Sequence, residues 1–102
     1  MLTNIDHVAL IVDDPIEAAK WYATNFNVDI LYEDETWSFL QLENIKIAFV
    51  KKGTHPPHIA FKVHEFNNKD KIKTHRDGTI STYKRDPWGN IYELIKYPET
   101  DQ

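Results

Sequence analysis

The order of apolar and polar residues divides the chain into short strands and one clear helix. Residues 5–12 are almost continuously apolar and rich in β-branched side chains, which is typical of a buried strand. Asp14 and Pro15 then form a helix N-cap and first position, and apolar residues recur at three- and four-residue spacing over 16–26, as in an amphipathic helix. Alternating or β-branched runs predict further strands over 28–33, 36–42, 45–51, 58–63, 79–85 and 91–97.

The second half of the chain repeats the same order of elements, although the pattern is less clear there. The clearest linker is 53–57, and the strand after it has the character of the first strand. Residues 65–76 are polar and predict no more than a short, weak helix. We therefore expect a single α+β domain built of two modules, approximately 1–53 and 54–102, with the second shortened.

The composition of the chain limits which chemistry and which binding partners we expect. A chain of 102 residues with 41% apolar content is long enough for one core. The net charge of −4 and the lack of a basic cluster argue against nucleic acid and against a membrane surface, and no apolar run approaches a membrane span. A cytoplasmic location is the expectation. The absence of cysteine means that any metal must be held by nitrogen and oxygen donors.

Three polar residues stand among apolar residues on predicted strands. These are His7, His58 and Glu93. Burying an imidazole or a carboxylate without a partner costs several kcal/mol, so each needs an explanation. A single histidine of this kind is more often a satisfied core residue than a ligand. Two imidazoles and one carboxylate together, however, make a facial set that holds a divalent metal and leaves positions open.

Several short motifs in order resemble the vicinal oxygen chelate superfamily of glyoxalases, bleomycin-resistance proteins and extradiol dioxygenases. They are Asp-His-Val-Ala-Leu at 6–10, Trp-Tyr at 21–22, His-Ile-Ala-Phe at 58–61, Asp-Pro-Trp-Gly-Asn at 86–90 and Glu-Leu at 93–94. The resemblance implies two βαβββ modules that form a half-open mixed-sheet barrel. It also implies a divalent metal (Fe, Mn, Ni or Zn) held by His7, His58 and Glu93.

The chain departs from this pattern at several positions. Members with four protein ligands take one from the fourth strand, where this chain has Ala48, which argues against a four-ligand glyoxalase I mechanism. Ser81 and Tyr83 precede the turn at 86–90 as in fosfomycin-resistance transferases, although Ala9 replaces the expected threonine and no arginine follows Glu93. The candidates for substrate contact are Ala9, Trp37, Phe39, Ala48, Ser81 and Tyr83.

Other charged and aromatic residues have simpler interpretations. Lys46 and Lys62 could bind an anionic substrate. We expect instead that the charged ends of both side chains reach solvent at the rim of the barrel. The remaining histidines lie in or beside predicted loops and are expected to be solvated: His55, His64 and His75. An exposed Trp88 would mark a dimer contact.

The leading hypothesis is a metal-dependent enzyme that acts on a small oxygen-rich substrate. Its reaction would be of the isomerase or lyase type, of the dioxygenase type, or of the thiol-transferase type. The main alternative is a metal-free small-molecule-binding protein of the bleomycin-resistance type, and a third is a scaffold with a vestigial site. A homodimer is expected from the resemblance and from the short second module, which would leave sheet edge uncovered.

Overall fold

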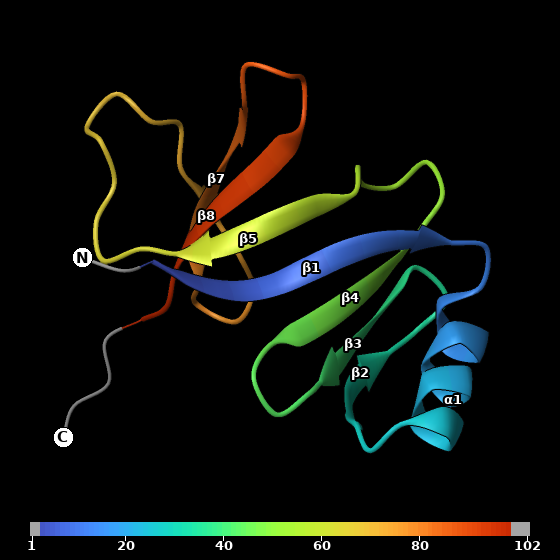
Figure 1. Ribbon diagram of the computed structural model, residues 1–102. Coiled ribbons are helices and arrows are strands. Elements are labelled where there is room, and N and C mark those ends of the chain that lie inside the picture. Colours follow the sequence, from blue (N-terminus) through green and yellow to red (C-terminus); the bar gives the residue numbers. More distant parts are fainter. Residues whose placement is uncertain (1–2, 99–102) are drawn as a thin grey trace, which may run out of the picture.

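The structure, a computed structural model, describes residues 3–98 (Figure 1). Its elements in chain order are β1 (Asn4–Val12), α1 (Pro15–Asn25), β2 (Asp29–Glu33), β3 (Trp37–Gln41), β4 (Lys46–Lys51), β5 (His58–Lys62), β6 (Lys73–Thr74), β7 (Ile80–Arg85) and β8 (Ile91–Lys96). No helical segment within this range is long and apolar enough to span a membrane.

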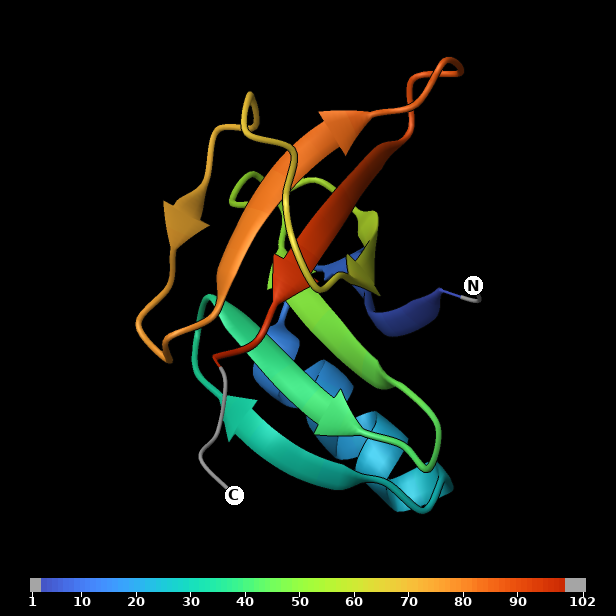
Figure 2. The ribbon, with the colours of Figure 1, turned by 90° about the vertical axis from the view of Figure 1, so that its left-hand side faces the viewer.

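All eight strands belong to one sheet with the order β2-β3-β4-β1-β5-β8-β7-β6. β1 pairs parallel with β4, and β5 pairs parallel with β8 in the corresponding way. β1 and β5 join the two halves as an antiparallel pair at the centre, so the first strand of each half lies beside the other (Figure 1). The sheet curves without closing, and β2 and β6 form its two free edges (Figure 2). The predicted half-open mixed sheet is therefore confirmed.

The hydrophobic core lies between α1 and the strands β2, β3 and β4 (Figure 2). Ala19 of the helix packs against Leu40 and Phe49, and all three are almost fully buried. The Ser38 hydroxyl donates to the Pro15 carbonyl at 2.9 Å, which fixes the start of the helix on the sheet. Because strand residues alternate between faces, the opposite face of the same strands carries Trp37, Phe39 and Ala48 toward a cavity.

The second half has no helix in the described range, so the expectation of a short, weak helix within 65–76 is wrong. The segment is loop except for the two-residue strand β6. It holds too few apolar residues for a helix to bury a face, and Ile72, one of its two apolar anchors, is 42% exposed. The outer face of β5 and β8 consequently has no helix over it.

Candidate metal centre

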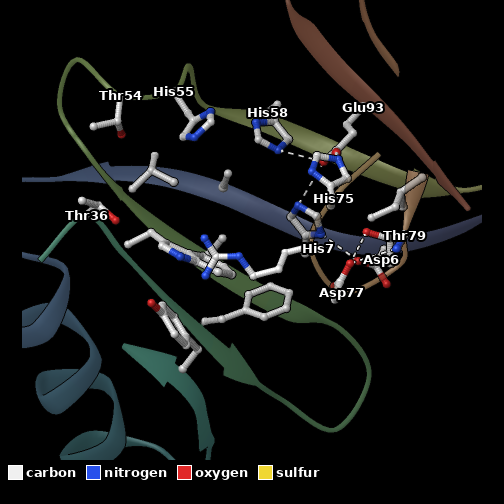
Figure 3. A pocket seen from close by; sticks show the side chains of 18 of the residues that line it. Asp6, His7, Thr36, Thr54, His55, His58, His75, Asp77, Thr79 and Glu93 are labelled. Carbon is white, nitrogen blue, oxygen red and sulfur yellow. Dashed lines mark hydrogen bonds and ion pairs between the residues drawn. The ribbon is translucent and has the colours of Figure 1, made fainter. Parts of the chain in front are cut away.

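His7, His58 and Glu93 come together on the inner face of the sheet. They lie on β1, β5 and β8, which are adjacent in the sheet, and one donor atom from each lies within 4.8 Å of the others. Glu93 Oε1 is 3.4 Å from His7 Nε2 and 3.3 Å from His58 Nε2. All three residues are buried, and they converge on one point of the cavity wall (Figure 3).

An irregularity in β1 gives His7 a carboxylate partner that the sequence did not reveal. The pairing of β1 with β5 shifts between Ile5 and His7, so strict alternation is broken there. Asp6 and His7 are both buried as a result. The His7 Nδ1–H donates to Asp6 Oδ2 at 2.7 Å, which leaves Nε2 to face Glu93.

The neighbours of His58 fix its tautomer. Its Nδ1 lies 3.0 Å from the Pro56 carbonyl oxygen, and because a carbonyl only accepts, Nδ1 carries the proton. In the neutral ring Nε2 therefore presents a lone pair toward the Glu93 carboxylate. This nitrogen is buried and has no hydrogen-bond partner among the described residues. Two lone pairs facing each other across 3.3 Å are unfavourable unless a metal cation or a proton lies between them.

These donors fit a divalent metal ion. Nitrogen and oxygen ligands at about 2.1 Å from one ion lie roughly 3–3.5 Å apart, which agrees with the two distances to Glu93 Oε1. An ion would also satisfy the buried His58 Nε2, which makes no hydrogen bond within residues 3–98. Burial works to raise the pKa of Glu93, but His58, His7 and Ser81 outweigh it and hold the carboxyl well below its usual range. The carboxylate is therefore ionised, as a ligand must be.

The cluster opens into a cavity of about 710 Å³. Five of the six predicted substrate-contact positions line it: Ala9, Trp37, Phe39, Ala48 and Tyr83. Ser81 is the exception, because it is fully buried behind the wall, where its hydroxyl is paired with His75. Ala48 is buried in the wall next to Ala9 and offers no fourth ligand. Burial, and then the Glu93 charge, raise the pKa of Tyr83, so its hydroxyl stays protonated.

His75 lies at the site, and the prediction that it is solvated is wrong. It is half-buried, with its Nε2 2.7 Å from Ser81 Oγ and 3.9 Å from Glu93 Oε2. The turn between β6 and β7 carries it to the cavity wall beside His7 and Glu93 (Figure 3). A two-residue strand is too short to show alternation, so no sequence signal marked this residue. His55 also lines the cavity but is exposed, and His64 is exposed, as predicted.

Lys46 is a structural residue rather than a free cation at the rim. Its Nζ lies 3.0 Å from Asp6 Oδ1 and 2.9 Å from the Tyr97 hydroxyl, which itself donates to Asp6 Oδ1. Burial alone would raise the pKa of Asp6, but the bonds from His7, Lys46 and Tyr97 lower it to about 2. Lys62 lies over the Tyr97 ring at 5.4 Å. Lys46 is therefore committed to Asp6 and is not available for a substrate.

Comparison with known proteins identifies the family. A model of the Glyoxalase/Bleomycin resistance protein/Dioxygenase superfamily matches residues 4–96, so the chain belongs to this superfamily. A search of curated proteins found no match.

Solved structures share the fold at low sequence identity. A hypothetical protein of Bacillus halodurans C-125 is 14% identical with a TM-score of 0.76, over 100% of this chain and 99% of that one. Methylmalonyl-CoA epimerase of Mycobacterium tuberculosis is 13% identical with a TM-score of 0.76, over 94% and 89%. A superfamily member from Vibrio splendidus 12B01 is 10% identical with a TM-score of 0.65, over 93% and 99%. At these identities the likeness establishes the architecture.

Proposed function

We propose that this protein is a metal-dependent enzyme that acts on a small substrate with two adjacent oxygen atoms. The observation that carries the proposal is the buried His58 Nε2, which makes no hydrogen bond within the described residues and lies 3.3 Å from the Glu93 carboxylate. His7, His58 and Glu93 would hold the ion. A divalent ion in such a site acts as a Lewis acid and stabilises negative charge that develops on substrate oxygen.

The residues around the cluster suit this chemistry. Ala9 and Ala48 form a wall with little side-chain volume, which leaves space for a substrate. Trp37 and Phe39, with ring centroids 5.3 Å apart, give a neighbouring wall an apolar surface that limits water.

Of the three reaction types, isomerisation by proton transfer has the strongest support. The cavity carries an imidazole besides the proposed ligands, His75, and because its Nε2 is paired with Ser81 Oγ, its Nδ1 is the nitrogen that would exchange a proton with a bound substrate. Tyr83 keeps its hydroxyl proton and can donate a hydrogen bond. Dioxygenase and thiol-transferase chemistry would each need a co-substrate, molecular oxygen or a thiol, in addition to the metal-bound substrate.

Metal content and thermal stability test the proposal first. Protein purified without added metal is analysed for bound elements and then titrated with Mn, Fe, Ni and Zn. We expect a raised midpoint of thermal unfolding with at least one ion, and loss of that rise in His58→Ala and Glu93→Ala. His64→Ala, which removes an exposed histidine away from the cluster, is the matched control and should keep the response.

Substrate screening then separates the candidate functions. The loaded protein is incubated with a small 1,2-diketone, with a catechol, and with an epoxide plus a thiol. We expect turnover of the first, with deuterium uptake from heavy water that His75→Ala reduces. No bound metal and no thermal response to any ion would instead favour a metal-free binding protein, for which the aromatic cavity wall would be the ligand site. Retained metal without turnover would indicate a vestigial site.

We also propose that the protein works as a homodimer. In the first half α1 covers one face of the sheet, whereas no helix of the part of the chain that the structure describes lies over the corresponding face of β5 and β8. Leu10 and Ile59 on this face are 43% and 42% exposed, and Trp88 at the adjacent hairpin tip is 83% exposed. A second copy of the chain would shield this apolar surface from water.

A further inference from the structure

Arg76 places a guanidinium group in the same cavity as the proposed metal ligands. It follows His75 in the turn between β6 and β7, and it lines the cavity together with His7, His58 and Glu93. The lining residues include no lysine and no other arginine. Within residues 3–98, Arg76 makes no ion pair, whereas Lys46 is held by Asp6. Its five N–H donors are therefore available to a ligand.

The carboxylates near the cavity mouth are already occupied by neutral donors. Asp34 Oδ1 accepts from the Thr36 and Trp37 backbone N–H groups and from the Thr36 hydroxyl, and Oδ2 accepts from the Tyr32 hydroxyl. Asp77 Oδ1 accepts from the Thr79 backbone N–H and the Thr79 hydroxyl. These bonds are local to each turn, so they hold both acids in place without Arg76.

Arg76 and Tyr32 line the same cavity but come from opposite ends of the sheet. Tyr32 lies on β2 at one edge of the sheet, while Arg76 comes from the turn before β7 near the other edge. The hydrogen bond to Asp34 raises the pKa of Tyr32, and the positive charge of Arg76 opposes that rise. The Tyr32 ring stacks near Trp37 at 5.0 Å between centroids. Arg76 thus shares the cavity with these two aromatic side chains.

We propose that Arg76 binds an anionic oxyacid group of the substrate. The substrate class would be a small acid whose adjacent oxygens face His7, His58 and Glu93 and whose carboxylate, phosphate or phosphonate lies at Arg76. The contact of the adjacent oxygens with the ligand cluster rests on the proposed function, whereas the contact of the anionic group with Arg76 needs no metal. The planar guanidinium fork matches two oxygens of either kind of anion.

The test uses metal-free protein, so that its outcome is independent of the metal site. The chain has two arginines, Arg76 and Arg85, and their Nε–H groups give two separable signals in proton–nitrogen correlation spectra. Arg85 donates to the Gly89 carbonyl outside the cavity and serves as the internal control. Inorganic phosphate, succinate and the neutral 1,2-propanediol are titrated separately.

We expect phosphate or succinate to shift the Arg76 signal and to leave the Arg85 signal in place, with no shift from the diol. Arg76→Gln should weaken binding of the anion about tenfold or more, Arg76→Lys less, and Arg85→Gln not at all. The anion that binds more tightly distinguishes a carboxylate from a phosphate or phosphonate end. The proposal fails if neither anion moves the Arg76 signal, or if Arg85→Gln weakens binding as much as Arg76→Gln. The zinc affinity of Arg76→Gln should match the wild-type value. This measurement distinguishes failure of the Arg76 proposal from failure of the metal site.

Discussion

At the scale of single residues, Asp6 joins the ligand cluster to the rest of the sheet through His7, Lys46 and Tyr97. We expect Asp6→Ala to weaken zinc affinity about tenfold to a hundredfold, because the His7 ring loses the partner that fixes its tautomer. The midpoint of thermal unfolding should also fall, because the half-buried Lys46 charge is left without a carboxylate.

Isothermal titration with zinc and thermal melts of the metal-free protein measure the two effects of Asp6→Ala. Asp6→Asn keeps the shape and the acceptor for His7 but removes the charge, so we expect it to lose less zinc affinity than Asp6→Ala. Asp29→Ala removes an exposed carboxylate from β2 and is the control. Unchanged zinc affinity in Asp6→Ala would show that Asp6 has no part in positioning His7.

The protonation of His7 predicts how zinc binding depends on pH. In the metal-free protein burial acts to lower the pKa of His7, but Asp6 and Glu93 outweigh it and raise the pKa above 6.5. A metal must displace the Nε2 proton, so zinc affinity should rise with pH until it passes this raised pKa. Titrations in buffers of different ionisation enthalpy should show release of a proton, and a pH-independent affinity would contradict the prediction.

The same ionisation gives the opposite trend in the stability of the metal-free protein. Because the folded pKa of His7 lies above its unfolded value, the stabilisation from the charged ring is full below about pH 6.5 and is lost as the pH rises through the folded pKa. Thermal midpoints of the wild type should fall over this range, and those of His7→Gln should not.

The residues of the cluster differ in how far the sequence could reveal them. His7, His58 and Glu93 could be predicted because each is polar within an apolar strand, and strand alternation places each on an inner face. Asp6 could not, because only the register shift in β1 turns two consecutive residues inward. His75 and Arg76 could not, since their position depends on a turn after a two-residue strand.

At the scale of elements, the cap of α1 can be tested separately from the site. Asp14 Oδ1 accepts from the backbone N–H groups of Ile16 and Glu17, both at 3.1 Å. Asp14→Ala should lower the free energy of unfolding by about 1 kcal/mol. Asp13→Ala, one residue earlier and exposed, should change it little. Zinc affinity should be unchanged in both, and equal stabilities of the two variants in urea would contradict the role of the cap.

The predicted elements agree with the structure wherever the pattern of apolar residues was strong. The strand expected over 91–97 is β8 (Ile91–Lys96), and the helix that Asp14 and Pro15 begin ends at Asn25. The polar segment 65–76 gave no such pattern, because its backbone is held by local turns. Asp70, for example, accepts from the Asn67 backbone N–H and pairs with Lys84 at 2.8 Å. Interactions of this kind leave no periodic signal.

At the scale of the whole molecule, the missing second helix is the main asymmetry between the two halves. The inner faces of both halves meet in one cavity, but only the first half is covered on its outer face. The uncovered face forms a groove between β1, β5 and β8, lined by side chains that include Leu10, Ile59 and Tyr92. Small single domains bury a limited share of their surface, so a partner bound in this groove would stabilise the fold by burying more of it.

The homodimer proposal predicts a specific effect of charge in this groove. Ile59→Lys places an ammonium group on the outer face of β5, where a second copy would have to desolvate it, so the dimer should dissociate. Leu31→Lys on β2 is the matched control, because Leu31 is 50% exposed and lies at the far edge of the sheet. Sedimentation equilibrium should give twice the 12.0 kDa of one chain for the wild type and for Leu31→Lys, and the single-chain mass for Ile59→Lys. Thermal melts at a fixed concentration should confirm that both variants fold, and a wild-type protein that sediments as one chain would show that the face is free in solution.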